Sequence, residues 1–393
     1  MAVPNYLSNL WKLKAIRMFF WMHFFAAVLI PFYTEWANLK LSQVLFINSW
    51  FMFWNFVLEV PTGTIADFLG RKISLALGSI AAVIAAAVYI SQPEFYTFLA
   101  AEFIFAVAYT LLSGADEALA YDSLKACNQE EQSKRILTGI ESYKMIGIII
   151  GTIIGGFIAK FGYDAPMRYY MIPAFISFLI ALSLKEPPFK ENTTERISYI
   201  TILKEGGGYF LKNKVLLLLT AELTLTNALA WGIIWLFQPL LANAGLPVAY
   251  YGFIHAGACL GQIVLLTNVD KMESFIGSKR LLLLYATIIT GCSFMLLAFT
   301  NYLPLVITGI IFGFTFCVRI PIFSSYMNKY IPSERRATIL SLTSMCRTIS
   351  IVVVNPIIGF LADWSVQYTM LILGALLLIS VAFTRIEEKH LIE

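Results

Sequence analysis

Long apolar runs separated by short polar connections dominate the sequence. Each run is long enough to cross a bilayer as a helix of about 20 residues. The expected spans, with boundaries good to a few residues, are 15–34, 43–64, 73–91, 96–122, 138–161, 168–184, 215–241, 248–268, 281–299, 302–327, 338–361 and 366–384. The pattern therefore predicts an all-α membrane protein with twelve transmembrane helices.

Composition and charge support this interpretation and orient the chain. Of the 393 residues, 59% are hydrophobic and only 13% are charged, which excludes an ordinary soluble domain. If the N-terminus is cytoplasmic, most bases, Arg17 among them, fall on the cytoplasmic side. The opposite side then holds only Lys40, Lys160 and Arg168. The positive-inside rule predicts a multi-pass protein of the plasma membrane with both termini in the cytoplasm.

A polar stretch at 185–214 divides the chain into two halves. We expect an N-terminal bundle at 1–184, a cytoplasmic linker at 185–214 and a C-terminal bundle at 215–393. The second half repeats the first with an offset of about 203 residues. This offset aligns Asp116 with Arg319. It also aligns Lys144 with Arg347.

The connection between the second and third spans carries a motif. Residues 63–72 read G-x-x-x-D-x-x-G-R-K, and we expect a tight polar turn there. Glycine at both ends would permit close packing or a positive φ. The residues that form the motif are Gly63, Asp67, Gly70, Arg71 and Lys72.

This motif resembles the loop between helices 2 and 3 of the major facilitator superfamily. The resemblance extends to the twelve spans, the two halves and the central linker. It implies two pseudo-symmetric six-helix bundles around a cavity lined mostly by helices 1, 4, 7 and 10, exposed alternately to each side. It also implies a monomer and a conformational gate at the inner surface, in which Asp122 joins Asp67 and Arg71.

Several charged residues lie within the predicted spans, where a charge costs roughly 2.5–3.5 kcal/mol. Counted at 1.5 Å per residue, they lie at one depth, about 12–16 Å from the cytoplasmic side. The proposed substrate-binding or coupling charges are Glu59, Asp116, Glu117, Lys144, Arg319 and Arg347, with Glu141 beside Lys144. The acids outnumber the bases by one, so one carboxyl is expected to carry a proton for part of the cycle.

Asp116 and Arg319 are expected to face one cavity and to act as a switch pair. If they do not interact, Asp116 is expected to pair with Lys144. Static pairing between helices is the alternative function for any of these charges.

The remaining candidate residues are Glu222, Trp231 and His23. The alternative for Trp231 is aromatic packing, and the alternative for His23 is a hydrogen-bonded packing role.

A glycine ladder at 147, 151, 155 and 156 resembles the helix-5 motif of antiporters in this superfamily. Thr152 stands where that motif has proline, and ordinary helix packing is the alternative. Glu102 stands where the proton-driven drug antiporters carry an arginine.

No ATP-binding sequence is present, and no zinc-ligand H-E-x-x-H or nucleophile G-x-S-x-G motif. We therefore expect a secondary active transporter of a small organic solute, not an enzyme. The expected partners are the solute, protons and the lipid bilayer, without nucleic acid, cofactor or metal. Export is favoured on the glycine ladder alone. The alternatives are proton-coupled uptake of a metabolite and a membrane sensor on the same scaffold.

Overall fold

The computed structural model describes residues 6–188, 207–331 and 336–384, and these contain helices and no strands. Twelve helical segments of this part of the chain are long and apolar enough to span a membrane, which confirms the all-α prediction. Their bounds are Ser8–Trp36, Leu41–Glu59, Arg71–Tyr89, Phe95–Lys125, Glu130–Phe161, Ala165–Leu182, Lys214–Asn243, Val248–Thr267, Lys279–Phe299, Leu303–Met327, Ile339–Trp364 and Val366–Phe383.

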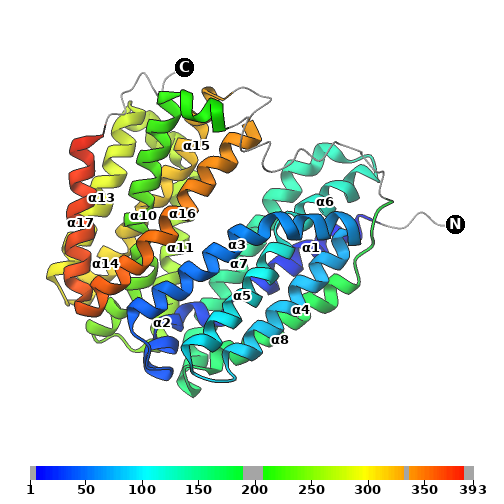
Figure 1. Ribbon diagram of the computed structural model, residues 1–393, viewed down its shortest axis with the longest axis horizontal. Helices are drawn as coiled ribbons and strands as arrows, with labels where there is room; N and C mark the ends of the chain where they lie inside the picture. The colour runs from blue at the N-terminus through cyan, green and yellow to red at the C-terminus, as the bar shows by residue number, and fades with distance from the viewer. Residues whose placement is uncertain (1–5, 189–206, 332–335, 385–393) are drawn as a thin grey trace. The chain divides into compact units, whose positions relative to one another are not determined.

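The chain forms two compact units (Figure 1). The first unit holds the helices up to α8 together with Pro247–Ala256. Its helices are α1 (Ser8–Phe20), η1 (Phe24–Val28), α2 (Leu29–Pro31), the π-helical η2 (Phe32–Trp36), α3 (Leu41–Leu69), α4 (Arg71–Tyr89), α5 (Phe95–Leu112), α6 (Ala115–Lys125), η3 (Glu130–Gln132), α7 (Ser133–Ile158), η4 (Ala159–Phe161), α8 (Ala165–Leu182) and η5 (Val248–Tyr250).

The second unit holds α10 and the chain from Gly257 onward. Its helices are α10 (Lys214–Asn243), α11 (Tyr251–Thr267), which begins in the first unit, α12 (Val269–Ile276), α13 (Lys279–Phe299), α14 (Leu303–Gly313), η6 (Phe314–Val318), α15 (Arg319–Lys329), α16 (Arg336–Trp364) and α17 (Val366–Phe383). Much of the expected linker lies outside the described residues, so its bounds and its cytoplasmic position stay predictions.

Three spans are interrupted inside the apolar region. The first span changes from α1 through η1 and α2 to η2. The fourth breaks between α5 and α6, where Gly114 adopts a left-handed φ of 76°. The tenth changes from α14 through η6 to α15. Broken helices within a membrane are tolerated where other protein groups or a water-filled cavity satisfy the backbone. The breaks place Asp116 and Arg319 in the first turn of α6 and α15.

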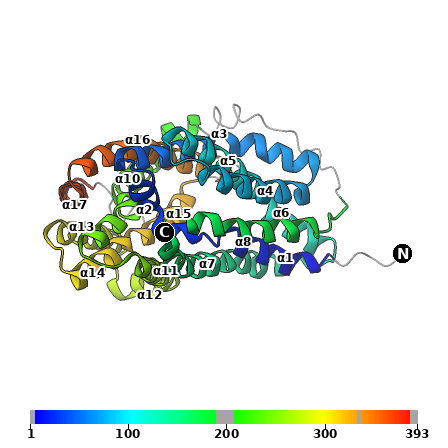
Figure 2. The ribbon, with the colours of Figure 1, turned by 90° about the horizontal axis from the view of Figure 1, so that it is seen from below.

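The glycine ladder of α7 is a packing surface. A Cβ on Gly147 would lie 2.3 Å from the carbonyl oxygen of Met18, and one on Gly155 would lie 1.7 Å from that of Phe24. The absence of side chains therefore lets α7 contact the backbone of α1 and η1. Figure 2 shows α1 between α7 and α8, both of which it contacts.

The same ladder holds the segment Pro247–Ala256 in the first unit. A Cβ on Gly156 would lie 2.6 Å from the carbonyl oxygen of Ala249, and one on Gly252 would lie 2.0 Å from that of Thr152. Backbone approaches this close explain why these residues group with the helices of the first unit.

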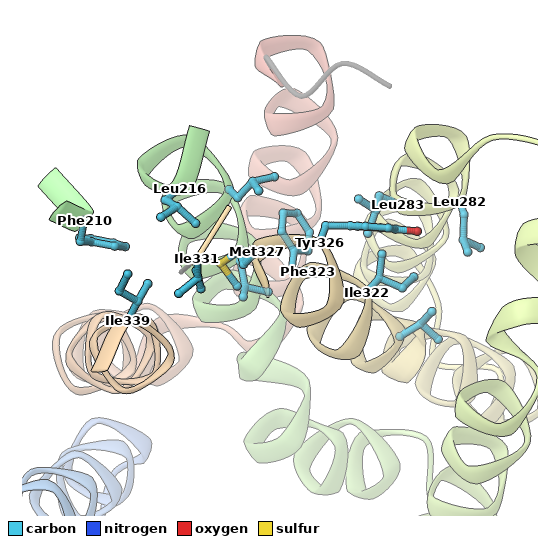
Figure 3. Packing of buried hydrophobic residues seen from close by; sticks show 13 residues of the cluster. Phe210, Leu216, Leu282, Leu283, Ile322, Phe323, Tyr326, Met327, Ile331 and Ile339 are labelled. Carbon is cyan, nitrogen blue, oxygen red and sulfur yellow. The ribbon is translucent and has the colours of Figure 1, made fainter. Parts of the chain in front are cut away.

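A buried apolar cluster fixes α15 in the second unit. Figure 3 shows Phe323 and Met327 of α15 with Leu216 of α10 on one side and Leu283 of α13 on the other. Phe323 is fully buried. Because this packing holds α15 against two neighbours, it also determines where the residue that begins α15, Arg319, places its guanidinium.

Candidate functional site

Four charged side chains of the first unit form a network that we call the Asp116 cluster: Arg17, Asp116, Glu141 and Lys144. Arg17 Nη1 lies 3.2 Å from Asp116 Oδ2, and its Nη2 lies 3.7 Å from Glu141 Oε2. Lys144 Nζ lies 2.5 Å from Glu141 Oε1. The charges alternate in sign and sum to zero, so the cluster joins the first, fourth and fifth spans without a net charge.

Asp116 is the most deeply buried member of the cluster, with 1% of its side chain exposed. It lies in the first turn of α6, where the helix dipole stabilises a carboxylate. Its Oδ1 accepts a hydrogen bond of 2.9 Å from the backbone N–H of Glu117. Its Oδ2 forms the ion pair with Arg17 and has no hydrogen-bond partner among the described residues.

Arg17 belongs to this network, although the sequence analysis does not single it out as a site residue. It is expected among the cytoplasmic bases, since the expected first span begins at residue 15. The helix begins at Ser8, so Arg17 lies about 13 Å along it. Only 13% of its side chain is exposed. The available signal was the apolar spacing of Leu13, Ile16 and Phe20, all buried, which continues the helix through the bases.

Aromatic rings adjoin the Asp116 cluster at the first break of span 1. Lys144 Nζ lies 4.8 Å from the ring of Trp21. His23 stacks on Trp21 and on Phe25, with centroids 5.2 Å and 4.8 Å apart, and meets Tyr170 edge-on at 5.2 Å. Among the described residues, Trp21 Nε1 and His23 Nε2 have no hydrogen-bond partner. His23 is thus packed among rings and keeps one free ring nitrogen.

The second unit has its own buried ion pair. Arg319 Nη2 donates to Glu222 Oε1 at 3.1 Å, and its Nη1 donates to the carbonyl oxygen of Leu283 at 3.4 Å. The guanidinium carbon lies 5.2 Å from the ring of Phe323. Thr384 Oγ1 donates a hydrogen bond to Glu222 Oε2. Arg319 is 3% exposed, whereas 14% of the Glu222 side chain is exposed, so the base is the more deeply buried member of the pair.

The two pairs occupy repeated positions with reversed signs. In the first unit the base is on the first span and the acid on the fourth. In the second unit the acid, Glu222, is on the first span of the half and the base on the fourth. The offset of 203 maps Arg17 to Thr220, two residues from Glu222. Each charge is paired within its own unit, so the predicted approach of Asp116 to Arg319 stays a prediction.

The alternative pairing of Asp116 with Lys144 is wrong, because Arg17 contacts Asp116 and Lys144 contacts Glu141. The physical reason is that Glu141, three residues before Lys144, lies on the same helix face and is the nearer acid.

Three expected members of the ionic layer are not part of these networks. Glu59 and Glu117 are exposed and Arg347 is half-buried, and none of the three forms an ion pair among the described residues. Equal depth did not bring them together, because successive helix residues point about 100° apart. Glu117 therefore diverges from Asp116 although the two are adjacent.

Trp231 lies on α10 with its indole N–H unpartnered among the described residues. Asn227, one helical turn earlier, is 3% exposed, and neither of its amide atoms has a hydrogen-bond partner in the described part of the chain. A buried amide without partners is costly unless a ligand or water satisfies it. This face of α10 thus offers unused donors and an acceptor.

The inner-gate motif has a smaller turn than expected. Helix α3 continues to Leu69, so the predicted turn over 63–72 is wrong, and only Gly70 interrupts the helices, with φ 96°. No atom lies within 4 Å of a Cβ built on Gly63, so this glycine serves neither close packing nor a turn. Asp67 lies in α3, and its side chain is outside those described.

The described contacts of Arg71 and Lys72 join α4 to α6 and to the segment that follows α8. Arg71 forms an ion pair with Asp122 of α6, and its Nη1 donates to the carbonyl oxygen of Ala118 at 2.8 Å. Glu186, which follows α8, accepts hydrogen bonds from the backbone N–H groups of Arg71 and Lys72 at 3.0 and 2.9 Å. Sequence reasoning missed Glu186, a carboxylate at the N-terminus of α4 where the dipole favours it.

Comparison with known proteins places this architecture among transporters. A family model described as the Major Facilitator Superfamily matches residues 15–226 and 223–391. A relative from Bacillus subtilis (strain 168), the uncharacterized MFS-type transporter YxaM, is 24% identical over 339 residues, which cover 85% of this chain and 84% of that protein.

Solved structures share the fold at low identity. The nucleoside transporter NupG superposes with a TM-score of 0.81 at 15% identity, over 96% of this chain and all of the other. A bacterial homologue of the human lysosomal transporter Spinster, inward-facing and occupied, gives 0.76 at 13% identity over the full length of both chains. A POT family transporter in complex with 5-aminolevulinic acid gives 0.70 at 14% identity, over 100% of this chain and 98% of that one.

Proposed function

This chain belongs to the Major Facilitator Superfamily and is a membrane transporter, not an enzyme, and on that premise we propose that it moves a small organic solute by alternating access, coupled to protons. The Asp116 cluster and the Arg319–Glu222 pair are the proposed substrate and coupling sites, one in each unit. The chain acts as a monomer in the plasma membrane, with both termini in the cytoplasm.

The sign-reversed pairs are the observation that carries this proposal. Desolvated charges within spans are expensive, and such residues commonly mark substrate or ion pathways. Both pairs lie beside broken helices, which is typical of transporter binding sites. A charged group of the solute would compete with the partner of the buried charge in the unit that it enters. A ligand that binds one arrangement of such a pair better than the other biases one conformation over another.

Proton coupling follows from the balance of the Asp116 cluster. The cluster is neutral while Arg17 contacts Asp116. If an anionic group of the solute takes Arg17, the buried carboxylate of Asp116 loses its counter-charge. Protonation of the carboxyl then removes that charge. Solute binding and proton binding would thus favour each other within one unit.

The glycine ladder, on which the expectation of export rests, packs against α1, η1 and the segment Pro247–Ala256. Close helix packing is needed for transport in either direction, so the ladder does not distinguish export from uptake.

Transport into proteoliposomes under an imposed pH gradient tests the proposal. The first probes are radiolabelled uridine and 5-aminolevulinic acid, followed by a panel of amino acids, organic acids and cationic drugs. We expect one class to accumulate against its gradient and a protonophore to abolish accumulation. Gradient-independent equilibration would contradict proton coupling, and movement of no solute together with specific binding would favour a sensor. Protein-free liposomes and the Asp164→Asn variant are the controls.

A further inference from the structure

A second buried carboxyl of the first unit lies apart from the Asp116 cluster. Glu102, on α5, is 8% exposed. Its Oε1 accepts a hydrogen bond of 3.4 Å from the hydroxyl of Tyr33, which lies 3.1 Å from the hydroxyl of Tyr89. The two tyrosines are 1% and 4% exposed. The three groups come from spans 4, 1 and 3, and we call them the Glu102 triad.

The surroundings of the triad are aromatic, and no base from the part of the chain that the structure describes faces its carboxyl. Phe98 packs edge-on against Tyr33 at 5.1 Å and stacks on Tyr89 at 5.8 Å. The ionisable groups that face the carboxyl are Tyr33 from η2 and Tyr89 from α4. Helix α3 also packs on α5, and it adds no ionisable group to this set among the described residues. Glu102 thus differs from Asp116, whose charge is balanced by Arg17.

We propose that Glu102 binds and releases the coupling proton, with Tyr33 and Tyr89 as its hydrogen-bonding partners. This inference rests on the proton coupling proposed above, and it adds Glu102 to Asp116 as a second carboxyl that binds a proton. Glu102 precedes Asp116 by fourteen residues in one span, so the two carboxyls are separated by about 20 Å along the helix axis. A proton and a solute can therefore occupy the same unit without competing for one carboxyl.

Hydroxyl rotation lets the triad hold the carboxyl in both protonation states. When Glu102 is ionised, Tyr33 and Tyr89 both donate to the carboxylate. When a proton adds to a carboxyl oxygen, the new O–H donates to Tyr33, Tyr33 turns to donate to Tyr89, and Tyr89 still donates to the carboxyl group. Each state uses the same three oxygens, because a phenol both donates and accepts. Proton uptake thus requires no buried donor to lose its partner.

The backbone around the triad is irregular. Tyr33 belongs to the π-helical η2, and Tyr89 is the last residue of α4. Short π-helical segments occur often at functional sites. Because an unpaired carboxylate within a span is expensive, the ionised triad favours a conformation that admits water, and the protonated triad favours the closed one. The proton would thereby bias the position of η2 against α4 and α5.

Infrared spectroscopy of the purified full-length protein tests the inference without a solute or a gradient. We expect a carboxylic-acid C=O band that appears reversibly between alkaline and acidic buffers and shifts in D2O. The band should be lost in Glu102→Gln. It should persist at a shifted frequency in Tyr33→Phe, because one hydrogen bond to the carboxyl is removed. Glu94→Gln, an exposed acid just before α5, and Tyr96→Phe, an exposed phenol on α5, are the matched controls.

The outcomes separate clearly. A spectrum unchanged by Glu102→Gln would overturn the inference, and so would a band that stays at constant intensity in every buffer, since a permanently protonated carboxyl transfers no proton. Glu102→Asp keeps the acid and should keep a titrating band, which distinguishes loss of the proton from loss of the fold. Failure of the proposed proton-coupled transport would instead be seen in the wild-type proteoliposomes.

Discussion

At the residue scale, the buried charges Asp116 and Arg319 are each paired with an opposite charge of their own unit. Asp116 contacts Arg17, and Arg319 contacts Glu222. Such pairs add little net stability when both members are present, because desolvation opposes their attraction. Removal of one member is far more costly, since the other then remains buried without a counter-charge. The pairs are therefore sensitive points for both folding and transport.

Asp116→Asn should destabilise the protein by about 3 kcal/mol, because it leaves Arg17 without its buried partner. The double variant Arg17→Gln/Asp116→Asn should lose less than the sum of the single variants. Chemical unfolding in detergent measures both. Asp164→Asn is the control, since it removes an exposed pair with Arg168 and should cost less than about 1 kcal/mol. Equal losses in the two aspartate variants would contradict the pairing.

At the element scale, packing of α7 depends on positions where any side chain would collide with backbone. Gly151 and Gly155 both approach the first span in this way. The cost of a methyl group there cannot be relieved by rotation of a neighbouring side chain, because the obstacle is a main-chain atom. Helix α7 would have to move away from α1 and η1, and with it Glu141 and Lys144.

Gly155→Ala should therefore lower the stability by at least about 1–3 kcal/mol through overpacking. Gly63→Ala is the matched control, because that glycine is also within a helix but faces open space. It should raise the stability by up to about 1 kcal/mol, the usual difference between the two residues in a helix. Thermal unfolding in detergent compares the variants. Similar behaviour of both would show that the ladder is not tightly packed.

At the scale of the whole molecule, the gate motif links α4 and α6 through Arg71 and Asp122. We propose that this contact biases one conformation without touching the solute. Asp122→Asn should therefore lower the turnover number severalfold while the solute affinity changes less. The measurement compares initial uptake rates in proteoliposomes with equilibrium binding in detergent. Glu131→Gln, an exposed acid after α6, is the control. A parallel loss of binding would place Asp122 in the solute site.

The orientation of the twelve spans also has a direct test. In a cysteine-free background, Asn128→Cys and Gln92→Cys should react with a membrane-impermeant thiol reagent from opposite sides. Position 92 precedes the fourth span and position 128 follows it, so one span separates them. The distribution of bases predicts that position 128 is cytoplasmic. Labelling of both from one side would contradict the twelve-span topology.

The sequence by itself determined the number, the order and most bounds of the spans. Bilayer thickness sets the length of an apolar run, so counting runs such as 73–91 was enough. The motif at 63–72 indicated the family, and the offset of 203 placed Asp116 and Arg319 at equivalent positions. These features are local or periodic along the chain, which is why they could be recognised without coordinates.

Only the tertiary structure decided which charges meet. Spacing along a helix determines depth, but the direction of each side chain depends on how the helices pack, so Glu59 and Glu117 were grouped with Asp116 without contacting its partners. Arg17 and Asp116 are 99 positions apart in the sequence and become neighbours because α6 packs against α1. The packing also buried Glu102 beside two phenols, where the sequence showed only an acid in place of an arginine.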